Sequence, residues 1–190
     1  MNSLKSGLKV AGWNDGPFDF GQDAPVPLVG VITRGGNLVE GVIKTSVEVD
    51  GLDGTEKLIA AIERSRHRED LALITLDGIT VGGFNVIDIA KLSAQTGIPV
   101  VAVTRKTPDL PSFRKALAEI PDAEPRLRAA ERAGKIRTVT VGKKEVCYQK
   151  SGLPAEEAER AISLTATHSC LPEPIRLAGM IAKSIVDGES

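Results

Sequence analysis

The 190-residue sequence is poor in the residues that cross-link small folds and in the apolar runs that mark membrane proteins. Its two cysteines, Cys147 and Cys170, lie far apart and show no C-x-x-C or Cys/His ligand spacing. They fit free thiols in a reducing compartment, so neither a disulfide framework nor structural zinc is expected. No apolar run approaches the roughly 18 residues of a membrane span, and residues 1–12 lack an apolar signal core. We therefore expect a soluble, cytoplasmic protein without a membrane partner.

An excess of charge of one sign is also absent from the chain as a whole. The net charge of -1 argues against a protein that coats nucleic acid through bulk positive charge. Residues 126–150 nevertheless hold only two acidic residues against eight basic ones, which are Arg126, Arg128, Arg132, Lys135, Arg137, Lys143, Lys144 and Lys150. This cluster is either a patch that contacts a nucleic-acid backbone or the solvated face of a helix and a hairpin.

The chain has no internal repeat, low-complexity tract or linker that would divide it. With 42% hydrophobic residues it can bury a core of its own, so we expect a single domain over residues 1–190. No G-x-G-x-x-G motif follows the first predicted strand, which argues against a dinucleotide-binding domain.

The apolar periodicity predicts an α/β fold. Strand-like patterns occupy residues 8–14, 28–33, 38–49, 71–76, 99–104, 137–141 and 145–149. Helix-like patterns occupy residues 55–66, 85–95, 154–167 and 174–186, and Thr96-Gly97 ends the second of them. Three consecutive strands followed by alternating strands and helices predict a mixed, partly antiparallel central sheet with helices on both faces. That is the order of a three-layer ribonuclease H-like fold.

Two turn-rich segments lie within the first three predicted strands. Gly35-Gly36-Asn37 separates two β-branched runs and predicts a hairpin with positive φ angles. Residues 16–27 contain three prolines and two glycines, so they predict a loop that leaves the first strand.

The strongest local signal is the run L-A-L-I-T-L-D-G at residues 71–78, a buried strand that ends in Asp77 and Gly78. Ligands of open α/β sheets bind outside the carboxyl ends of parallel strands, so Asp77 points toward the usual place of a site. Gly78 allows a tight turn and close approach of a substrate. The alternative is that Asp77 only caps the following turn.

The surrounding sequence resembles endonuclease V. Asp77-Gly78 is followed by Gly82-Gly83-Phe84, a helical pattern, and the strand T-G-I-P-V-V-A-V-T that leads into Arg105-Lys106. The resemblance implies that Asp77 is a metal-binding aspartate and that Lys106 lies near the scissile phosphate. It also implies a nucleic-acid substrate, either DNA or RNA.

A second block supports this resemblance. The run L-P-E-P-I-R-L-A at residues 171–178 is close to the L-P-E-P-x-R-x-A run that ends endonuclease V. For Glu173 and Arg176 we favour a structural role, in which they fix the last helix against the sheet, over a role in the site. D-G-P-F at residues 15–18 and V-D-G-L-D at residues 49–53 are closer still to a largely archaeal branch, the domain of unknown function 99 family. With that branch, the resemblance covers nearly the whole chain.

Phosphodiester hydrolysis needs positive charge beside the attacking water and the leaving oxygen. Mg²⁺ or Mn²⁺ supplies this charge and prefers carboxylate oxygens, so two or three acidic side chains should converge at one sheet edge. A neighbouring lysine, here Lys106, can neutralise charge that develops on the phosphate.

The first strand departs from the endonuclease V pattern. When the glycine of the family's G-[IV]-D sequence is aligned with Gly12, the metal aspartate falls at Asn14, and a neutral amide is a weaker Mg²⁺ ligand. Asp15 can replace it if the strand ends or bulges there, because adjacent strand side chains point to opposite faces. We therefore assign Asp15 as the first-strand ligand.

The third strand also departs from the pattern. With Gly41 as anchor, the family's glutamate falls near Val47, and Asp50 at the strand end is the replacement that we assign, because its setting copies that of Asp77. Asp53 instead predicts a helix N-cap, with Glu56 completing a capping box. The family's histidine before the penultimate helix and its aromatic wedge are missing at residues 151–153 and 38–41.

The two histidines remain. His67 lies in a charged run at a predicted helix end, where a cation favours the helix dipole. His168 lies in a loop before Cys170, from which it could approach the site.

These residues leave two functions open. The first is a metal-dependent endonuclease or phosphodiesterase with Asp15, Asp50 and Asp77 as metal ligands, and Asp15, Asp77 and Lys106 as catalytic residues. The second is a non-catalytic nucleic-acid- or protein-binding relative that has lost part of the metal site. The survival of these residues at strand ends favours the first, whereas Asn14, Val47 and the missing histidine favour the second.

Overall fold

The computed structural model describes residues 7–19 and 24–190. Outside the described residues lie two short stretches, which are residues 1–6 of the 1–12 segment and residues 20–23 of the predicted 16–27 loop. Residues 16–19 and 24–25 of the loop contain no helix or strand, whereas the predicted loop ends two residues too late, because Val26 and Pro27 already belong to a strand. No helix among the described residues is both long and apolar enough to cross a membrane.

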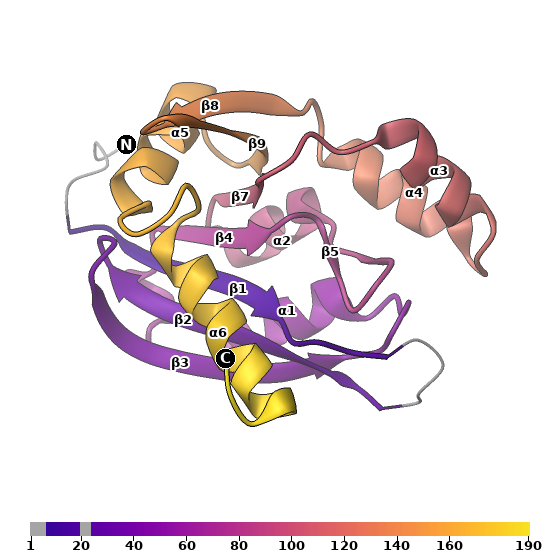
Figure 1. The fold of residues 1–190 in the computed structure, drawn as a ribbon, viewed down its shortest axis with the longest axis horizontal. Helices are drawn as coiled ribbons and strands as arrows, with labels where there is room; N and C mark the ends of the chain where they lie inside the picture. Colours follow the sequence, from indigo (N-terminus) through magenta and orange to yellow (C-terminus); the bar gives the residue numbers. More distant parts are fainter. Residues whose placement is uncertain (1–6, 20–23) are drawn as a thin grey trace.

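The centre of the molecule is a seven-stranded mixed sheet in the order β3-β2-β1-β4-β7-β9-β8 (Figure 1). Its first half is an antiparallel meander of β1 (Lys9–Asp15), β2 (Val26–Arg34) and β3 (Leu38–Val47). The predicted hairpin joins β2 to β3, and Gly35 has the expected positive φ of 60°. The predicted strands in this half are therefore confirmed, with β3 two residues shorter than expected.

The second half of the sheet begins with two strands that are parallel to β1. Strands β4 (Leu73–Asp77) and β7 (Val100–Thr104) run parallel to β1, so the carboxyl ends of these three strands share one sheet edge. Beyond them, β9 (Lys144–Ser151) and β8 (Arg137–Val141) add an antiparallel hairpin. A separate small hairpin, β5 (Thr80–Val81) and β6 (Asn85–Val86), follows the end of β4.

Helices cover both faces of the sheet, as predicted. In Figure 1, α6 (Glu173–Asp187) crosses in front of β1 and β2, whereas α1 (Gly54–Glu63) and α2 (Ile89–Thr96) lie behind the sheet. The front layer also includes α5 (Ala155–Thr165), whose apolar residues pack with those of β7 and β9. A larger core behind the sheet joins side chains of β1, β2 and β4 to those of α1 and α2.

Small residues let α6 approach the sheet closely. A Cβ atom at Gly12 of β1 would collide with the backbone of Pro174 and Ile175 at the start of α6. Along the helix, Ala178 and Ala182 are fully buried against Val29 and Val31 of β2. Gly12 therefore sets the close approach of α6 to the strand that carries Asn14 and Asp15.

Two helices were not predicted from the sequence. Helices α3 (Leu110–Ala118) and α4 (Ala123–Arg132) form a hairpin between β7 and β8, at the right of Figure 1. Each has a proline in its first turn, and α4 buries only Arg126 and Ala129, so it lacks the apolar stripe that identifies an amphipathic helix.

The predicted 85–95 helix begins later than expected. Residues Asn85 and Val86 form β6, and α2 starts at Ile89 with the Asp88 carboxylate capping the Lys91 N–H at 3.0 Å. Asn85 is fully buried, where its side-chain oxygen accepts from the Gly54 N–H at 3.0 Å. A tertiary contact with the start of α1 therefore overrides the helical pattern of this segment.

Candidate active site

Asp77 is the last residue of β4 and lies beside the end of β1. Trp13 pairs with Leu76 across the two parallel strands, which brings Asn14 next to Asp77. The Asn14 Nδ2 donates a hydrogen bond to Asp77 Oδ2 at 3.1 Å. Asn14 thus faces the carboxylate, in the place that the endonuclease V pattern gives to an aspartate, but it acts as a donor to the acid beside it.

Asp15, the last residue of β1, is held by the turn between β5 and β6. Its Oδ2 accepts a 2.7 Å hydrogen bond from the Gly82 N–H, and its own N–H donates to Asn14 Oδ1 at 2.9 Å. The chain turns immediately afterwards, where the Gly16 N–H donates to the Pro27 carbonyl. Asp15 is therefore the last paired residue of β1, opposite Leu28, so the strand has neither ended nor bulged before it, and its role as a metal ligand stays a prediction.

Burial raises the pKa of both carboxyl groups. For Asp15, burial outweighs the hydrogen bond from Gly82, which lowers its pKa. For Asp77, burial is again the largest cause; the Arg105 charge and the Asn14 hydrogen bond lower its pKa, and the Asp15 charge raises it. The Asp15 charge therefore acts on Asp77, and for both acids burial outweighs the groups that favour the ionised form.

Asp50 is turned toward a different partner. It follows the end of β3 in a left-handed conformation with φ of 49°, and its Oδ1 accepts a 2.7 Å hydrogen bond from the Phe84 N–H. Its own N–H donates to the Gly82 carbonyl at 2.8 Å. Asp15 and Asp50 thus hold the same Gly82–Phe84 turn from two sides.

The structure does not gather the three predicted metal ligands into one group. Within residues 7–19 and 24–190, no three His, Cys, Asp or Glu side chains are placed so that they could hold one metal ion. Asp15 and Asp77 lie near each other, whereas the Asp50 carboxylate is engaged by Phe84. Val47, at the position of the family's glutamate, is buried in the core.

The positive charge that lowers the pKa of Asp77 belongs to Arg105 and not to Lys106, the residue predicted from the sequence. Both residues follow β7 and are exposed, and the positive charge of Arg105 lowers the pKa of Asp77. For Lys106, the structure gives only a backbone contact, in which its carbonyl accepts from Thr104 Oγ1 at 3.0 Å. The Arg105-Lys106 pair indicated a cation near Asp77, but the sequence does not show which of two adjacent residues faces the neighbouring strand.

Two members of the basic cluster, Arg126 and Arg132, hold α4 against the rest of the fold. Arg126, 4% exposed, donates to the backbone carbonyls of Asp50, Gly51 and Phe84. Arg132 forms a 2.7 Å ion pair with Asp88, and Arg128 pairs with Glu124 along α4. The exposed remainder, Lys135, Arg137, Lys143 and Lys144, is the part of the cluster that stays available to a partner.

Glu173 and Arg176 form a structural ion pair at the start of α6. The buried Glu173 accepts from Arg176 Nε at 2.9 Å and Nη2 at 2.6 Å, and this contact lowers the pKa of Glu173. His168 Nδ1 lies 3.2 Å from the same carboxylate. His168 is therefore placed against Glu173, and the structural interpretation of this segment is supported.

Asp53 occupies the N-cap position of α1 but forms no capping hydrogen bond. The predicted capping box is therefore wrong. Its Oδ1 accepts from Asn85 Nδ2 at 2.7 Å and from the Glu48 N–H at 3.3 Å, because buried Asn85 competes for it.

Comparison with known proteins identifies the family. A family model described as Endonuclease dU matches residues 6–186. A UPF0215 protein of Methanothermobacter thermautotrophicus is 41% identical over all of this chain and 93% of its own length. A crystal structure of a protein of unknown function from Archaeoglobus fulgidus is 37% identical, covers 94% of this chain and 98% of that chain, and has a TM-score of 0.86.

Endonuclease V enzymes share the fold at low identity. The Bacillus subtilis enzyme is 12% identical, with 95% of this chain and 81% of that chain covered and a TM-score of 0.63. The Ciona intestinalis enzyme, in complex with inosine-containing DNA, is 12% identical, with 90% and 81% covered and a TM-score of 0.58. The predicted ribonuclease H-like fold and the resemblance to endonuclease V are confirmed, and the chain belongs to the Endonuclease dU family, which includes the UPF0215 proteins.

Proposed function

We propose that this protein is a divalent-metal-dependent endonuclease that cleaves a nucleic-acid strand, with Asp15 and Asp77 as its metal-binding carboxylates. The observation that carries the proposal is the pair of half-buried carboxyl groups at the ends of the neighbouring strands β1 and β4, each with a pKa raised by burial. Groups perturbed in this way cluster at functional sites. The description of the family suggests deoxyuridine as the base recognised, and the DNA complex of the Ciona enzyme supports nucleic acid as the partner.

The donor set suits Mg²⁺ or Mn²⁺. Mg²⁺ keeps several of its waters and is held by one or two carboxylates together with substrate phosphates, so two acids are sufficient. A bound ion would relieve the repulsion between Asp15 and Asp77, activate the attacking water and neutralise charge on the phosphate.

The remaining residues of the site orient these two acids and the substrate. Asn14 fixes one oxygen of Asp77, and the Gly82 N–H fixes one oxygen of Asp15. Arg105, which follows β7 and acts on Asp77, carries a positive charge that attracts the substrate phosphate. We propose Lys106 as a second cation near that phosphate, and Asp50 as the residue that holds the Gly82–Phe84 turn or, once a metal is bound, as a third ligand.

The test is cleavage of 30-nucleotide strands that contain one deoxyuridine, one inosine or neither, in Mg²⁺, in Mn²⁺ and in chelator. We expect metal-dependent cleavage at the modified base, with a loss of about 100-fold or more in Asp77→Asn. Asp187→Asn, which removes an exposed carboxylate of α6, is the matched control and should behave like the parent. Cleavage that persists in chelator, or in Asp77→Asn at the parental rate, would contradict the proposed site.

The second candidate is a non-catalytic relative that binds nucleic acid. It is favoured by one observation, the absence of a third acid grouped with Asp15 and Asp77 among the described residues. It predicts that the protein binds the same strands without cleaving them, and that affinity is independent of metal and of Asp77. Calorimetric titration with Mn²⁺ separates the two functions, because only the first requires an ion at these carboxylates.

A further inference from the structure

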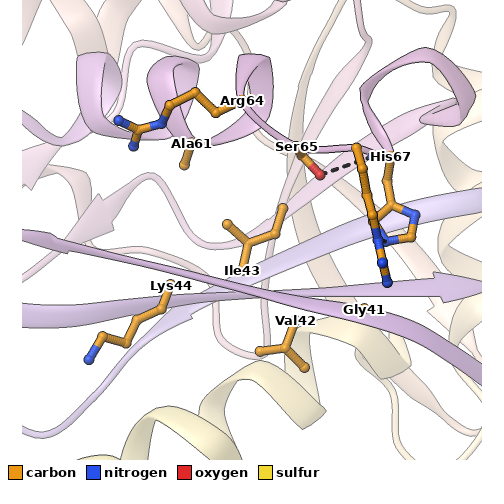
Figure 2. A pocket seen from close by; sticks show the side chains of 9 residues that line it. Gly41, Val42, Ile43, Lys44, Ala61, Arg64, Ser65 and His67 are labelled. Carbon is orange, nitrogen blue, oxygen red and sulfur yellow. Dashed lines mark hydrogen bonds between the residues drawn. The ribbon is translucent and has the colours of Figure 1, made fainter.

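Cationic side chains gather at the C-terminal end of α1, which is the end away from Asp15 and Asp77. This end holds an open pocket of about 420 Å³ lined by residues 41–44 of the edge strand β3 and by residues 61 and 64–67 at the end of α1 and in the following turn. Figure 2 shows Ile43 of β3 pointing toward α1, with Arg64 and His67 at the two ends of the opposite wall, whereas Lys44 points away from α1. None of the lining residues is acidic.

The cations of this pocket lack acidic partners. Within the described parts of the chain, Lys44, Arg64 and Arg66 form no ion pair with a carboxylate. The acid nearest in sequence, Glu63, is already bonded to Arg68 Nε at 2.9 Å. Arg64 and Arg66 therefore bring two positive charges to one pocket without an acidic partner, which is the arrangement that attracts an anion.

The wall formed by Arg66 and His67 is held in place. Arg66 Nε donates to His67 Nε2 at 3.2 Å, and the His67 N–H donates to Ser65 Oγ at 3.2 Å. A Cβ atom on Gly41 would lie 2.7 Å from His67 Nε2, so a larger residue at this point of β3 would displace the ring. The hydrogen bond to His67 fixes Nε of Arg66 and leaves its terminal nitrogens for a planar or tetrahedral oxyanion.

We infer that this pocket binds a phosphate group. The guanidinium groups of Arg64 and Arg66 match the charge and donor geometry of phosphate. Helix α1 has ten residues and is about 15 Å long, with the pocket at its end, whereas Gly54 at its start donates to Asn85, next to the Gly82–Phe84 turn. If the phosphate belongs to a strand, about four to five nucleotides at about 3.4 Å each span the length of this helix. A phosphate that belongs to a nucleic-acid strand rests on the proposed function, whereas a phosphate that belongs to a free small ligand does not.

The test compares two double variants that remove the same charge. Arg64→Gln with Arg66→Gln changes the pocket, whereas Lys115→Gln with Arg160→Gln removes two exposed cations of α3 and α5 that likewise form no ion pair. Binding of a fluorescent 25-nucleotide single strand is measured by anisotropy in chelator over a series of salt concentrations. A parallel calorimetric titration uses inorganic phosphate alone. Because chelator prevents turnover, a failure here is independent of whether the carboxylates support cleavage.

For a strand phosphate, the pocket variant should reduce the slope of log affinity against log salt by about 1.4, or 0.7 for each contact, and weaken binding about tenfold at low salt. The control should retain the parental slope. Loss of phosphate binding alone, with strand binding intact, would assign the pocket to a free phosphate-bearing ligand. If the two double variants behave alike in both titrations, the pocket has no phosphate site.

Discussion

The two ends of β1 carry charged residues in opposite circumstances. At its start, Lys9 is 7% exposed and contacts Glu40 at 2.9 Å and Asp70 at 3.0 Å, while Arg34 contacts Glu40 at 2.6 Å. At its end, Asp15 lies near a second acid, Asp77, and their partners are a backbone N–H and an amide. Opposite charges therefore neutralise each other at one end of the strand, whereas like charges are brought together at the other.

The pKa values show the same difference in direction. Hydrogen bonds from Lys9 and Arg34 lower the pKa of Glu40, because they favour its ionised form. Burial raises the pKa of Asp15 and Asp77, because it disfavours the ionised form of these two carboxyl groups. The carboxyl end of β1 is therefore the end that the proposed function would explain, because half-buried acids whose pKa is raised by burial cost stability, and a role in a site would account for that cost.

The largest expected effect separates Asp15 from Asp50. Asp15→Asn should reduce metal-dependent cleavage about 100-fold or more without lowering the thermal midpoint, because the new amide oxygen still accepts from the Gly82 N–H. Asp50→Asn can accept from Phe84 in the same way and should keep cleavage within about threefold if Asp50 only holds the turn. Equal losses in both variants would show instead that Asp50 is a metal ligand.

A smaller effect is expected from Asn14→Asp. This change adds negative charge at the carboxyl end of β1 and so increases the difference in charge between the two ends of the strand. Asn14 already contacts Asp77, so an aspartate there adds a third negative charge at this sheet edge. Affinity for Mn²⁺ should rise about tenfold, and the thermal midpoint without metal should fall. Calorimetry and thermal unfolding with and without Mn²⁺ measure the two changes. Unchanged Mn²⁺ affinity would remove Asn14 from the metal site.

Most of the sheet could be predicted from the sequence, because each central strand is an apolar run bounded by turn residues. Asp77 could be found for the same reason, since it ends such a run and precedes a glycine. The direction of the Asp50 carboxylate could not be found. It depends on a left-handed backbone at a non-glycine residue and on the N–H of Phe84, 34 positions away.

The α3–α4 hairpin escaped prediction for a related reason. Its inner helix is held through the buried guanidinium of Arg126, which bonds the turns at Asp50 and Phe84. Patterns of apolar residues carry no information about a polar contact of this kind. The sequence therefore located the edge of the sheet where the acids lie, but it could not show which acids meet there.

The smallest expected effect is a difference in the pH dependence of stability between the two ends of β1. The pKa of Asp15 and Asp77 is raised above 3.8 in the fold, so these groups oppose folding at neutral pH, and the penalty disappears as the pH falls through their raised values. The double variant Asp15→Asn with Asp77→Asn should therefore unfold about 2 to 4 °C above the parent at pH 7 without metal, with the gap closing toward pH 4.

Glu40 should behave in the opposite way. Its pKa is lowered from 4.5, so its contribution to stability is complete above 4.5 and is lost as the pH falls through the lowered value. Glu40→Gln should therefore unfold below the parent at pH 7, and the difference should persist to about pH 4.5 and shrink only below it. Thermal unfolding at half-unit steps from pH 3.5 to 7.5 measures both differences. If the Asp15 and Asp77 variant is the less stable one at pH 7, these acids stabilise the fold, and the contrast between the two ends of β1 is not one of function against structure.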